Sequence, residues 1–340
     1  FEGEYINGER NGKGKEYDFE GEYINGKRNG KGKEYYEIKK ISKIKFEGEY
    51  LNDKKWNGKG YDTENNIIFE LKNGKGFVKE YNEWNYSEYE GEYLNGERHG
   101  KGKEYNYGKL IFEGEFLNGK RWNGKGYDNE KKIKYELNNG KGFVTEYYWY
   151  NNNMIFEGQY INGEKNGKIK EYDNYGRLIF EGEYLNGKRN GKGIKYENAI
   201  IIYKGEFLNG KRNGYGKEFE NGHIVFIGEY YNDGKKKGKY YIDQKVEFEG
   251  EFLFDRKWDG KGYNQNGNII YELINGNGKV KEYSTFEGNL LFEGEYLNGK
   301  RNGYGKEYYY TSFRKIKEPI LRFEGKYLNG KRNGKGKEYD

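Results

Sequence analysis

Alternating hydrophobic and polar positions recur along the whole chain in units of similar sequence. The unit from Phe180 to Tyr196 reads FEGEYLNGKRNGKGIKY, with aromatic residues at its positions 1 and 5, glycine at position 3 and glutamate at positions 2 and 4. A period of two residues is typical of a β-strand with two unlike faces. Positions 7 and 8 are Asn-Gly, which favours a tight turn because both residues tolerate positive φ. Because positions 11 to 15 alternate again, each unit is predicted to form a β-hairpin.

Units of this kind follow one another, usually 20 to 24 residues apart. A period in this range indicates a repeat array, in which stability is a sum of contacts between neighbouring units. The predicted fold is all-β, an elongated, solenoid-like, twisted antiparallel sheet of about 15 stacked hairpins that forms a single continuous array over 1–340. Looser junctions are expected at 36–45, as a longer hairpin arm, and at 309–322, which holds the only proline, Pro319. The units begin at Phe1, Phe19, Phe46, Phe69, Tyr89, Phe112, Tyr135, Phe156, Phe180, Tyr203, Phe226, Phe248, Tyr271, Phe292 and Phe323.

The pairing within one hairpin can be predicted from the unit. With a four-residue loop, positions that sum to 17 face each other, which places Tyr184 opposite Gly191 and Gly182 opposite Gly193. A two-residue turn would shift the pairing but would leave the two faces unchanged. Glycine leaves room for a ring to lie flat against the backbone, so one face is predicted to carry rings beside glycines.

The opposite face is predicted to carry glutamate and lysine. In the same register Glu183 faces Lys192, a cross-strand pair of opposite charge. Leu185 lies on this face near the turn, and this gives the charged face an apolar border.

The recurring motif Y/F-E-G-E-Y/F-x-N-G-x-x-N/H-G-x-G resembles the MORN repeat, and residues 89–105 (YEGEYLNGERHGKGKEY) are a close match. The resemblance covers nearly the whole chain. MORN units place an aromatic residue two positions after the last glycine, where this chain usually has glutamate (Glu16, Glu34, Glu104, Glu307) and the tyrosine follows one residue later. This departure predicts that the tyrosine lies on the opposite face or follows a bulge, and it is closer to the variant type of bacterial and viral arrays. The resemblance implies an extended sheet of stacked hairpins that acts mainly as a scaffold, often at membranes or cytoskeletal structures.

A larger period groups the units in threes. Triplets begin at 46, 112, 180 and 248, and three of them open with a unit that carries an inserted tryptophan, Trp56, Trp122 or Trp258. In each of these three a shortened unit follows, in which Leu71, Leu137 or Leu273 replaces the glycine at position 3. We interpret each tryptophan as the structural anchor of a longer loop; a platform on which a ligand stacks is the alternative.

Composition favours a thin core of rings packed on glycines. Only 33% of residues are hydrophobic, but 19% are aromatic and 55 are glycine. The net charge of +6 arises from 62 basic and 56 acidic residues that are interleaved, without a basic tract. Cysteine is absent, which excludes disulfides and thiolate chemistry. No apolar run approaches 18 residues, so no membrane-spanning helix is predicted. Because the chain begins inside a repeat at Phe1, we expect further residues to precede it.

Residues arranged for catalysis are not evident. His99 and His223 are far apart in the sequence and do not suggest a zinc site. No serine has the G-x-S-x-G context, and the many G-x-G triplets lack the lysine and the helix of a phosphate loop. The sequence therefore predicts a protein that is not an enzyme and that has no cofactor or metal.

A Lys-Arg pair recurs at the predicted turns and is the first candidate interaction surface. The hypothesis is that an anionic membrane surface or an acidic protein partner binds this rim; the alternative is that it only provides solubility. Because no unit offers an exposed apolar side chain beside its Lys-Arg loop, lipid binding is predicted to be electrostatic. Nucleic acid is not an expected partner, since the tyrosines are committed to the core. The pairs are Lys27-Arg28, Lys188-Arg189, Lys211-Arg212, Lys300-Arg301 and Lys331-Arg332.

A second candidate surface is a stripe of leucines on the charged face, which stacking would align. A long apolar stripe commonly marks an interface, so self-association into a homo-oligomer is predicted; the alternative is that each leucine covers its own turn. We therefore expect a non-enzymatic scaffold that binds protein partners in the cytoplasm, peripheral to a membrane or the cytoskeleton. A glycan-binding aromatic repeat protein is a further alternative. The stripe comprises Leu94, Leu117, Leu185, Leu208, Leu297 and Leu328.

Overall fold

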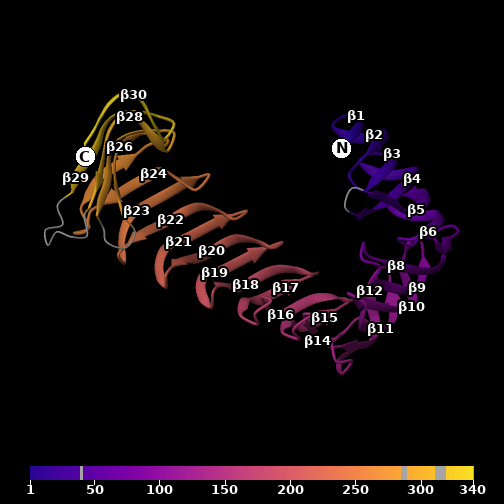
Figure 1. Ribbon diagram of the computed structural model, residues 1–340. Helices are drawn as coiled ribbons and strands as arrows, with labels where there is room; N and C mark the ends of the chain where they lie inside the picture. Colours follow the sequence, from indigo (N-terminus) through magenta and orange to yellow (C-terminus); the bar gives the residue numbers. More distant parts are fainter. Residues whose placement is uncertain (39–40, 285–288, 311–318, 340) are drawn as a thin grey trace. The chain divides into compact units, whose positions relative to one another are not determined.

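A computed structural model describes residues 1–38, 41–284, 289–310 and 319–339. These residues form the strands β1 to β30 and no helix (Figure 1). The chain divides into two compact units, Phe1–Arg177 and Leu178–Asp340, and each is described by itself.

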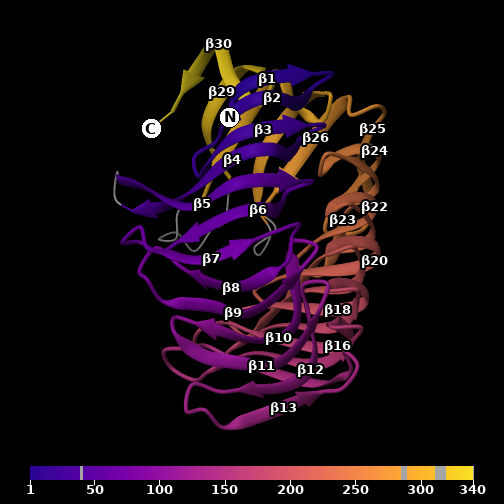
Figure 2. The same cartoon turned by 90° about the vertical axis from the view of Figure 1, so that its right-hand side faces the viewer.

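In the first unit, strands follow the repeat units in order (Figure 2). Strands β1–β7 form one antiparallel sheet, β8–β13 form another, and β14, β15 and β16 pair in that order. The bounds are β1 Glu2–Ile6, β2 Glu9–Lys15, β3 Phe19–Ile24, β4 Lys27–Ile38, β5 Ile41–Leu51, β6 Lys54–Tyr61, β7 Ile67–Leu71, β8 Gly76–Tyr81, β9 Ser87–Leu94, β10 Glu97–Asn106, β11 Lys109–Leu117, β12 Lys120–Tyr127, β13 Ile133–Leu137, β14 Gly142–Tyr147, β15 Met154–Ile161 and β16 Glu164–Tyr172.

In the second unit, β17 to β25 pair in sequence order and β26–β30 form a separate antiparallel sheet. In the described residues, no sheet has its first strand paired with its last. The bounds are β17 Leu178–Leu185, β18 Lys188–Glu197, β19 Ile200–Leu208, β20 Lys211–Glu220, β21 His223–Tyr231, β22 Gly234–Ile242, β23 Lys245–Leu253, β24 Arg256–Tyr263, β25 Ile269–Leu273, β26 Gly278–Tyr283, β27 Leu290–Leu297, β28 Lys300–Tyr309, β29 Ile320–Leu328 and β30 Lys331–Glu338.

The hairpin β17–β18 shows how the repeat sets its register. Asn186 and Gly187 have φ of 50° and 77°, which makes a two-residue turn and pairs Leu185 with Lys188. Further from the turn Gly182 faces Gly193, as the sequence predicts. The register of a two-residue turn therefore holds next to the turn, and the register of a four-residue loop holds further along the strands. A bulge between Gly182 and Tyr184 separates the two.

The predicted pairing of Tyr184 with Gly191 is wrong, and the bulge is the physical reason. Tyr184 pairs with Arg189, while Gly191 pairs with Phe207 of the next strand, β19. Gly191 has a φ of 90°, so glycine is needed there for backbone conformation. The side chain of Glu183 does not meet that of Lys192 in the predicted way; its carboxylate accepts a hydrogen bond from the Lys192 backbone N–H at 3.3 Å.

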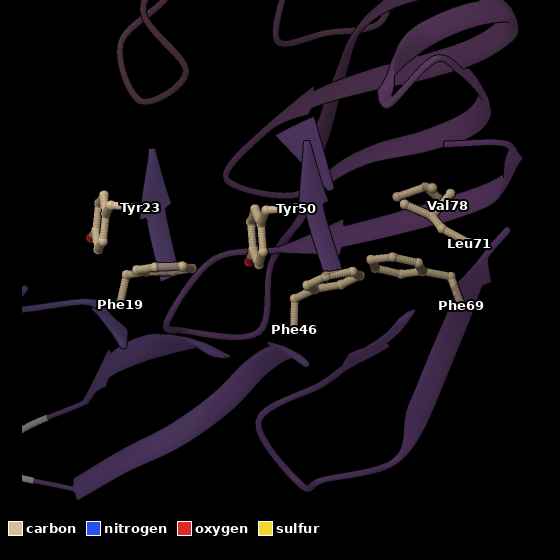
Figure 3. Close-up of a cluster of buried hydrophobic side chains, with 7 residues drawn as sticks. All are labelled: Phe19, Tyr23, Phe46, Tyr50, Phe69, Leu71 and Val78. Atoms are coloured by element: carbon tan, nitrogen blue, oxygen red, sulfur yellow. The ribbon is translucent and has the colours of Figure 1, made fainter. Parts of the chain in front are cut away.

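Aromatic rings from successive hairpins form the core. Phe19 contacts Tyr23 of its own strand and Tyr50 of β5, with ring centroids 5.6 and 5.0 Å apart and planes nearly perpendicular. Phe46 continues the row with Tyr50 at 5.5 Å (Figure 3). These four rings are buried. Edge-to-face pairs of this kind contribute about 0.5–1.5 kcal/mol each beyond the area that they bury, so the core is a continuous row of rings along the hairpins of each unit.

A second bulge accounts for the glutamate that departs from the family pattern. In β10–β11 the register shifts between Glu104 and Tyr105, and the same shift occurs after Glu34 and Glu307. The tyrosine that follows lies on the glutamate-bearing face; the Tyr308 hydroxyl, for example, donates to Glu293 at 2.7 Å.

Sheets end at the shortened units. At each shortened unit, backbone pairing between its two strands is limited to an isolated bridge at the turn, such as Lys72 with Lys75. The strand pairs are β7 and β8, β13 and β14, and β25 and β26. Where the two strands diverge, Leu71 and Val78 fill the space and are each 1% exposed (Figure 3). Trp56 contacts the turn, since its carbonyl oxygen accepts a hydrogen bond from Gly74 N–H at 2.7 Å and its ring lies against Gly74. We call each such place a corner.

The two expected junctions differ in what the structure shows. The described residues of the segment 36–45 extend the hairpin β4–β5, in which Tyr36 pairs with Lys43, and residues 39–40 lie outside the described residues. Most of the segment 309–322 lies outside the described residues.

Candidate interaction surface at the hairpin turns

Backbone hydrogen bonds align the turns of neighbouring hairpins within each unit. The Gly119 N–H donates to the carbonyl oxygen of Arg98 at 2.9 Å, and the Gly210 N–H donates to that of Arg189 at 2.8 Å. The Gly330 N–H makes the same bond to Arg301 at 2.9 Å. Residues at positions 6 to 10 therefore form a continuous border of the sheets, which we call the turn edge.

The lysines of the predicted Lys-Arg rim point into solvent. Lys27, Lys188, Lys211 and Lys331 are exposed, and Lys300 is half-buried. None of these five makes an ion pair within the described residues. Their charge is therefore available to a partner.

The arginines of the rim have a different environment, because each folds over the ring at position 1 of its own hairpin. The guanidinium carbon lies 4.1 Å from the ring centroid for Arg28 on Phe19 and for Arg301 on Phe292. Arg189 and Arg332 show the same distance on their rings. Arg212 lies 5.5 Å from the ring of Tyr203 in its own hairpin and 4.7 Å from that of Tyr230 in the next. Such cation–π contacts cover the core rings.

Glutamates at position 16, or at the matching place in a shortened unit, hold most of these arginines in ion pairs. Arg301 contacts Glu282 at 2.6 Å and Glu307 at 3.0 Å, and Glu307 also pairs with Arg332 of the next hairpin. Arg98 and Arg121 share Glu104 in the same way, at 3.2 and 2.7 Å. Glu104 and Glu307 thus each bridge two hairpins. The arginines of the rim are engaged in contacts within the protein and are less available to a partner than the lysines.

Burial raises the pKa of these glutamates, and the neighbouring cations lower it. Burial disfavours the charged form of Glu80, yet Lys55 and Arg98 outweigh it and lower its pKa below the ordinary value. Glu34 behaves alike: burial opposes ionisation, and Lys55 and Lys45 lower its pKa. The Tyr93 hydroxyl donates to Glu80 at 2.9 Å, so position-5 tyrosines complete the network.

The leucine stripe stays largely exposed at the turn edge. Leu185, Leu208, Leu297 and Leu328 are 48–50% exposed, Leu94 is 38% exposed, and Leu117 is half-buried. Leu185 pairs directly with Lys188, and Leu208 with Lys211. The prediction that no exposed apolar side chain lies beside the Lys-Arg loops is therefore wrong: the two-residue turn places a leucine across from the lysine.

Within the described residues, no group of three or more His, Cys, Asp or Glu side chains could hold a metal ion. No helix there is long and apolar enough to cross a membrane. The ring of Trp56 lies against Gly74, and Trp122 and Trp258 lie in the same way against Gly140 and Gly276. These contacts favour the structural interpretation of the tryptophans.

Sequence reasoning missed the Arg–Glu network. A signal was present, because Arg or Lys at position 10 recurs with Glu at position 16 in the full-length units. The bulge hid it, since positions 10 and 16 lie on the same strand, where residues six apart in a regular strand are separated by about 20 Å and do not meet.

Comparisons with known proteins identify the repeat. The model of the MORN repeat matches nine segments, which fall on full-length hairpins and miss the shortened units; they are 1–18, 19–38, 89–106, 112–123, 156–168, 180–196, 203–224, 292–312 and 323–340. Among curated proteins, none matches the chain.

Two solved structures that match are "Crystal Structure of TcdB2-TccC3 without hypervariable C-terminal region" and "Crystal Structure of TcdB2-TccC3-Cdc42". Each is 9% identical in sequence, with TM-scores of 0.19 and 0.18. The matches cover 87% and 90% of this chain but only 18% and 19% of those chains. Likeness at this level carries no argument about function. The nine matched segments, spread from the first hairpin to the last, show that this chain is a MORN repeat protein.

Proposed function

We propose that the protein is a non-enzymatic scaffold whose turn edge binds protein partners. Its hairpins, about 15 in number, would stack as a solenoid-like array. The observation that carries the proposal is the pairing of an exposed leucine with an exposed lysine at successive turns, as in Leu185–Lys188 and Leu208–Lys211. The rings, arginines and position-16 glutamates are used internally, whereas the leucines and lysines of the turn edge remain exposed to a partner.

Protein recognition suits this surface because apolar side chains alternate with charges that can pair with a partner. A row of exposed leucines is unusual in a surface that serves only solubility. The same row would allow self-association, with a second copy covering the leucines.

The test compares two triple variants in the second unit. Leu185→Lys, Leu208→Lys and Leu297→Lys together change the turn edge, whereas Tyr215→Lys, Ile269→Lys and Leu291→Lys change exposed residues away from the turns. Light scattering over a concentration series should show self-association of the parent and of the second variant and its loss in the first. Affinity capture from the native source should lose the same partner in the first variant alone. A parent that stays monomeric and captures no partner would remove the proposal.

An anionic membrane is the second candidate for this surface, favoured by the leucine beside each lysine. Interfacial binding combines burial of apolar side chains with attraction of lysine to anionic lipid. Flotation with phosphatidylserine vesicles should then persist in part at high salt, whereas attraction by lysine alone would disappear. Either partner is consistent with a cytoplasmic protein at a membrane or the cytoskeleton, which is our proposal for its location.

A further inference from the structure

One position in the second unit breaks the charge pattern of the repeat. In most full-length hairpins the residue paired with the position-1 ring is a glutamate. Glu218 shows the arrangement, since β20 places it between Tyr203 of β19 and Phe226 of β21. Arg212 contacts the first of these rings and Lys235 the second, and Glu218 pairs with Lys235 at 2.8 Å and with Arg212 at 3.7 Å.

Lys195 occupies this place in β18. It pairs with Phe180 of β17 on one side and with Tyr203 of β19 on the other. Arg189 lies 4.1 Å from the first ring, and Arg212 lies 5.5 Å from the second. Where most full-length hairpins hold a glutamate, this one therefore holds a third cation. Lys195 makes no ion pair in the part of the chain that the structure describes.

A cavity of about 820 Å³ lies at this position, and all three cations line it. Tyr203, Phe207 and Ile202 form an apolar wall. The cavity is thus large enough for a side chain with its neighbours. It lies on the ring-bearing face and includes Arg189, Gly210 and Arg212 of the turn edge, but neither the exposed leucines nor the exposed lysines of that edge line it.

Carboxylates also line the cavity, and their positions decide its charge. Glu218 pairs with Lys235, and Asp233 lies 3.6 Å from the Arg212 guanidinium, so both are neutralised by cations. Glu197 and Glu220 lie at the ends of β18 and β20 that are furthest from the turn edge. The centre of the cavity is therefore cationic, while its far end is acidic.

We propose that this cavity binds an anionic group, a carboxylate or a phosphate, carried by a partner peptide with apolar flanking residues. The anion takes the place of the missing glutamate and pairs with Lys195, as Glu218 pairs with Lys235 one hairpin later. Arg189 and Arg212 keep their own contacts and add to the positive field. Flanking apolar side chains pack on Ile202 and Phe207. A walled cavity of this size favours a side chain over the surface of a membrane.

The test uses the full chain and short peptides, Gly-Ile-X-Ile-Gly, in which X is phosphoserine, glutamate or serine. Isothermal titration calorimetry should show saturable binding of the phosphoserine and glutamate peptides and none of the serine peptide. Lys195→Glu restores the glutamate of the repeat and is expected to fold; it should weaken binding at least tenfold. Lys192→Glu changes charge equally at an exposed position of the same strand and should leave binding within about twofold, because Lys192 does not line the cavity and charge at an exposed position is screened by solvent and salt.

Thermal melting provides an independent measurement. Lys195→Glu should raise the melting temperature, because the new carboxylate bridges two arginines, and Lys192→Glu should not. Equal binding by the Lys195→Glu variant would overturn the proposal. Inorganic phosphate that binds as tightly as the peptides would overturn the peptide as the ligand, and so would anionic vesicles whose flotation depends on Lys195. Because the turn-edge variants leave this cavity intact, its failure and that of the proposed scaffold can be told apart.

Discussion

Gly182 and Gly193 face each other across β17 and β18, and the ring of Phe180 lies against both. A Cβ atom on Gly193 would be 2.6 Å from the Phe180 Cζ, and one on Gly182 would be 2.6 Å from the Gly193 Cα. Neither glycine has a positive φ. Glycine is therefore required at these positions for space, because the core ring packs directly against the backbone of the paired glycines.

Gly193→Ala should destabilise the second unit by about 1–3 kcal/mol, because the added methyl group overpacks the ring of Phe180. Gly234→Ala is the matched control: Gly234 lies in a strand, lacks a positive φ, and its Cβ would meet only the Tyr231 carbonyl oxygen at 3.5 Å. It should change stability by less than about 0.5 kcal/mol. Urea denaturation followed by circular dichroism measures both, and equal midpoints would contradict the packing argument.

Arg301→Ala should be far more destabilising than Lys300→Ala, although the two residues are neighbours on the turn edge. Arg301 covers Phe292 and pairs with Glu282 and Glu307, so its loss removes the ion pair of Glu282 and leaves Glu307 with Arg332 alone. Its side chain is 26% exposed, which reduces the cost below that of a fully buried pair, to about 1–3 kcal/mol. Lys300 has no such contacts, and its loss should cost less than about 0.5 kcal/mol. Equal unfolding midpoints of the two variants would show that the arginine is not structural.

Acid should unfold the array in a defined window. Burial opposes ionisation of Glu80 and Glu218, but the cations beside them lower both pKa values below the ordinary 4.5. A carboxyl group with a lowered pKa in the folded state stabilises fully above the unfolded value and loses this contribution as pH falls through the folded value. The urea midpoint should therefore be constant near neutral pH and decline below about pH 4.5. In Glu80→Gln the decline should be smaller and the midpoint at pH 7 lower; an unchanged pH profile would exclude Glu80 as a contributor.

The sequence predicts the hairpins and their faces well, because both depend on local features. Asn186-Gly187 specifies the turn, and alternation places Phe180 and Tyr184 on the buried face. The bulge at Glu183 could not be predicted, since it depends on how a two-residue turn is reconciled with the facing pair of Gly182 and Gly193. Because of this bulge, Gly191 is needed for its positive φ and not, as the sequence predicts, to make room for the ring of Tyr184.

In the candidate surface, too, local sequence predicts the environment of some residues and not of others. The exposure of Lys188 and Leu185 follows from alternation next to a turn. The internal role of Arg189 does not follow, because its contact with the Phe180 ring depends on the direction of a long side chain after the bulge. Repetition is the information that could have shown it: residues that recur together at positions 10 and 16 are expected to interact.

Leu273→Ala should reveal what closes a corner of the second unit. In a full-length hairpin the glycines at positions 3 and 14 face each other, but here Leu273 faces Gly260 and Val280 faces Gly294, because β25 and β26 belong to different sheets. Leu273 is 1% exposed and fills the space between the diverging strands, so its truncation should cost about 2–5 kcal/mol through the cavity it leaves. The adjacent Ile274 is 66% exposed, and Ile274→Ala should cost less than about 0.5 kcal/mol. Hydrogen exchange should show the loss of protection beginning at the amides of β25 and β26. Protection lost evenly over β17–β30 would mean that the corner is no weaker than the sheets on either side of it.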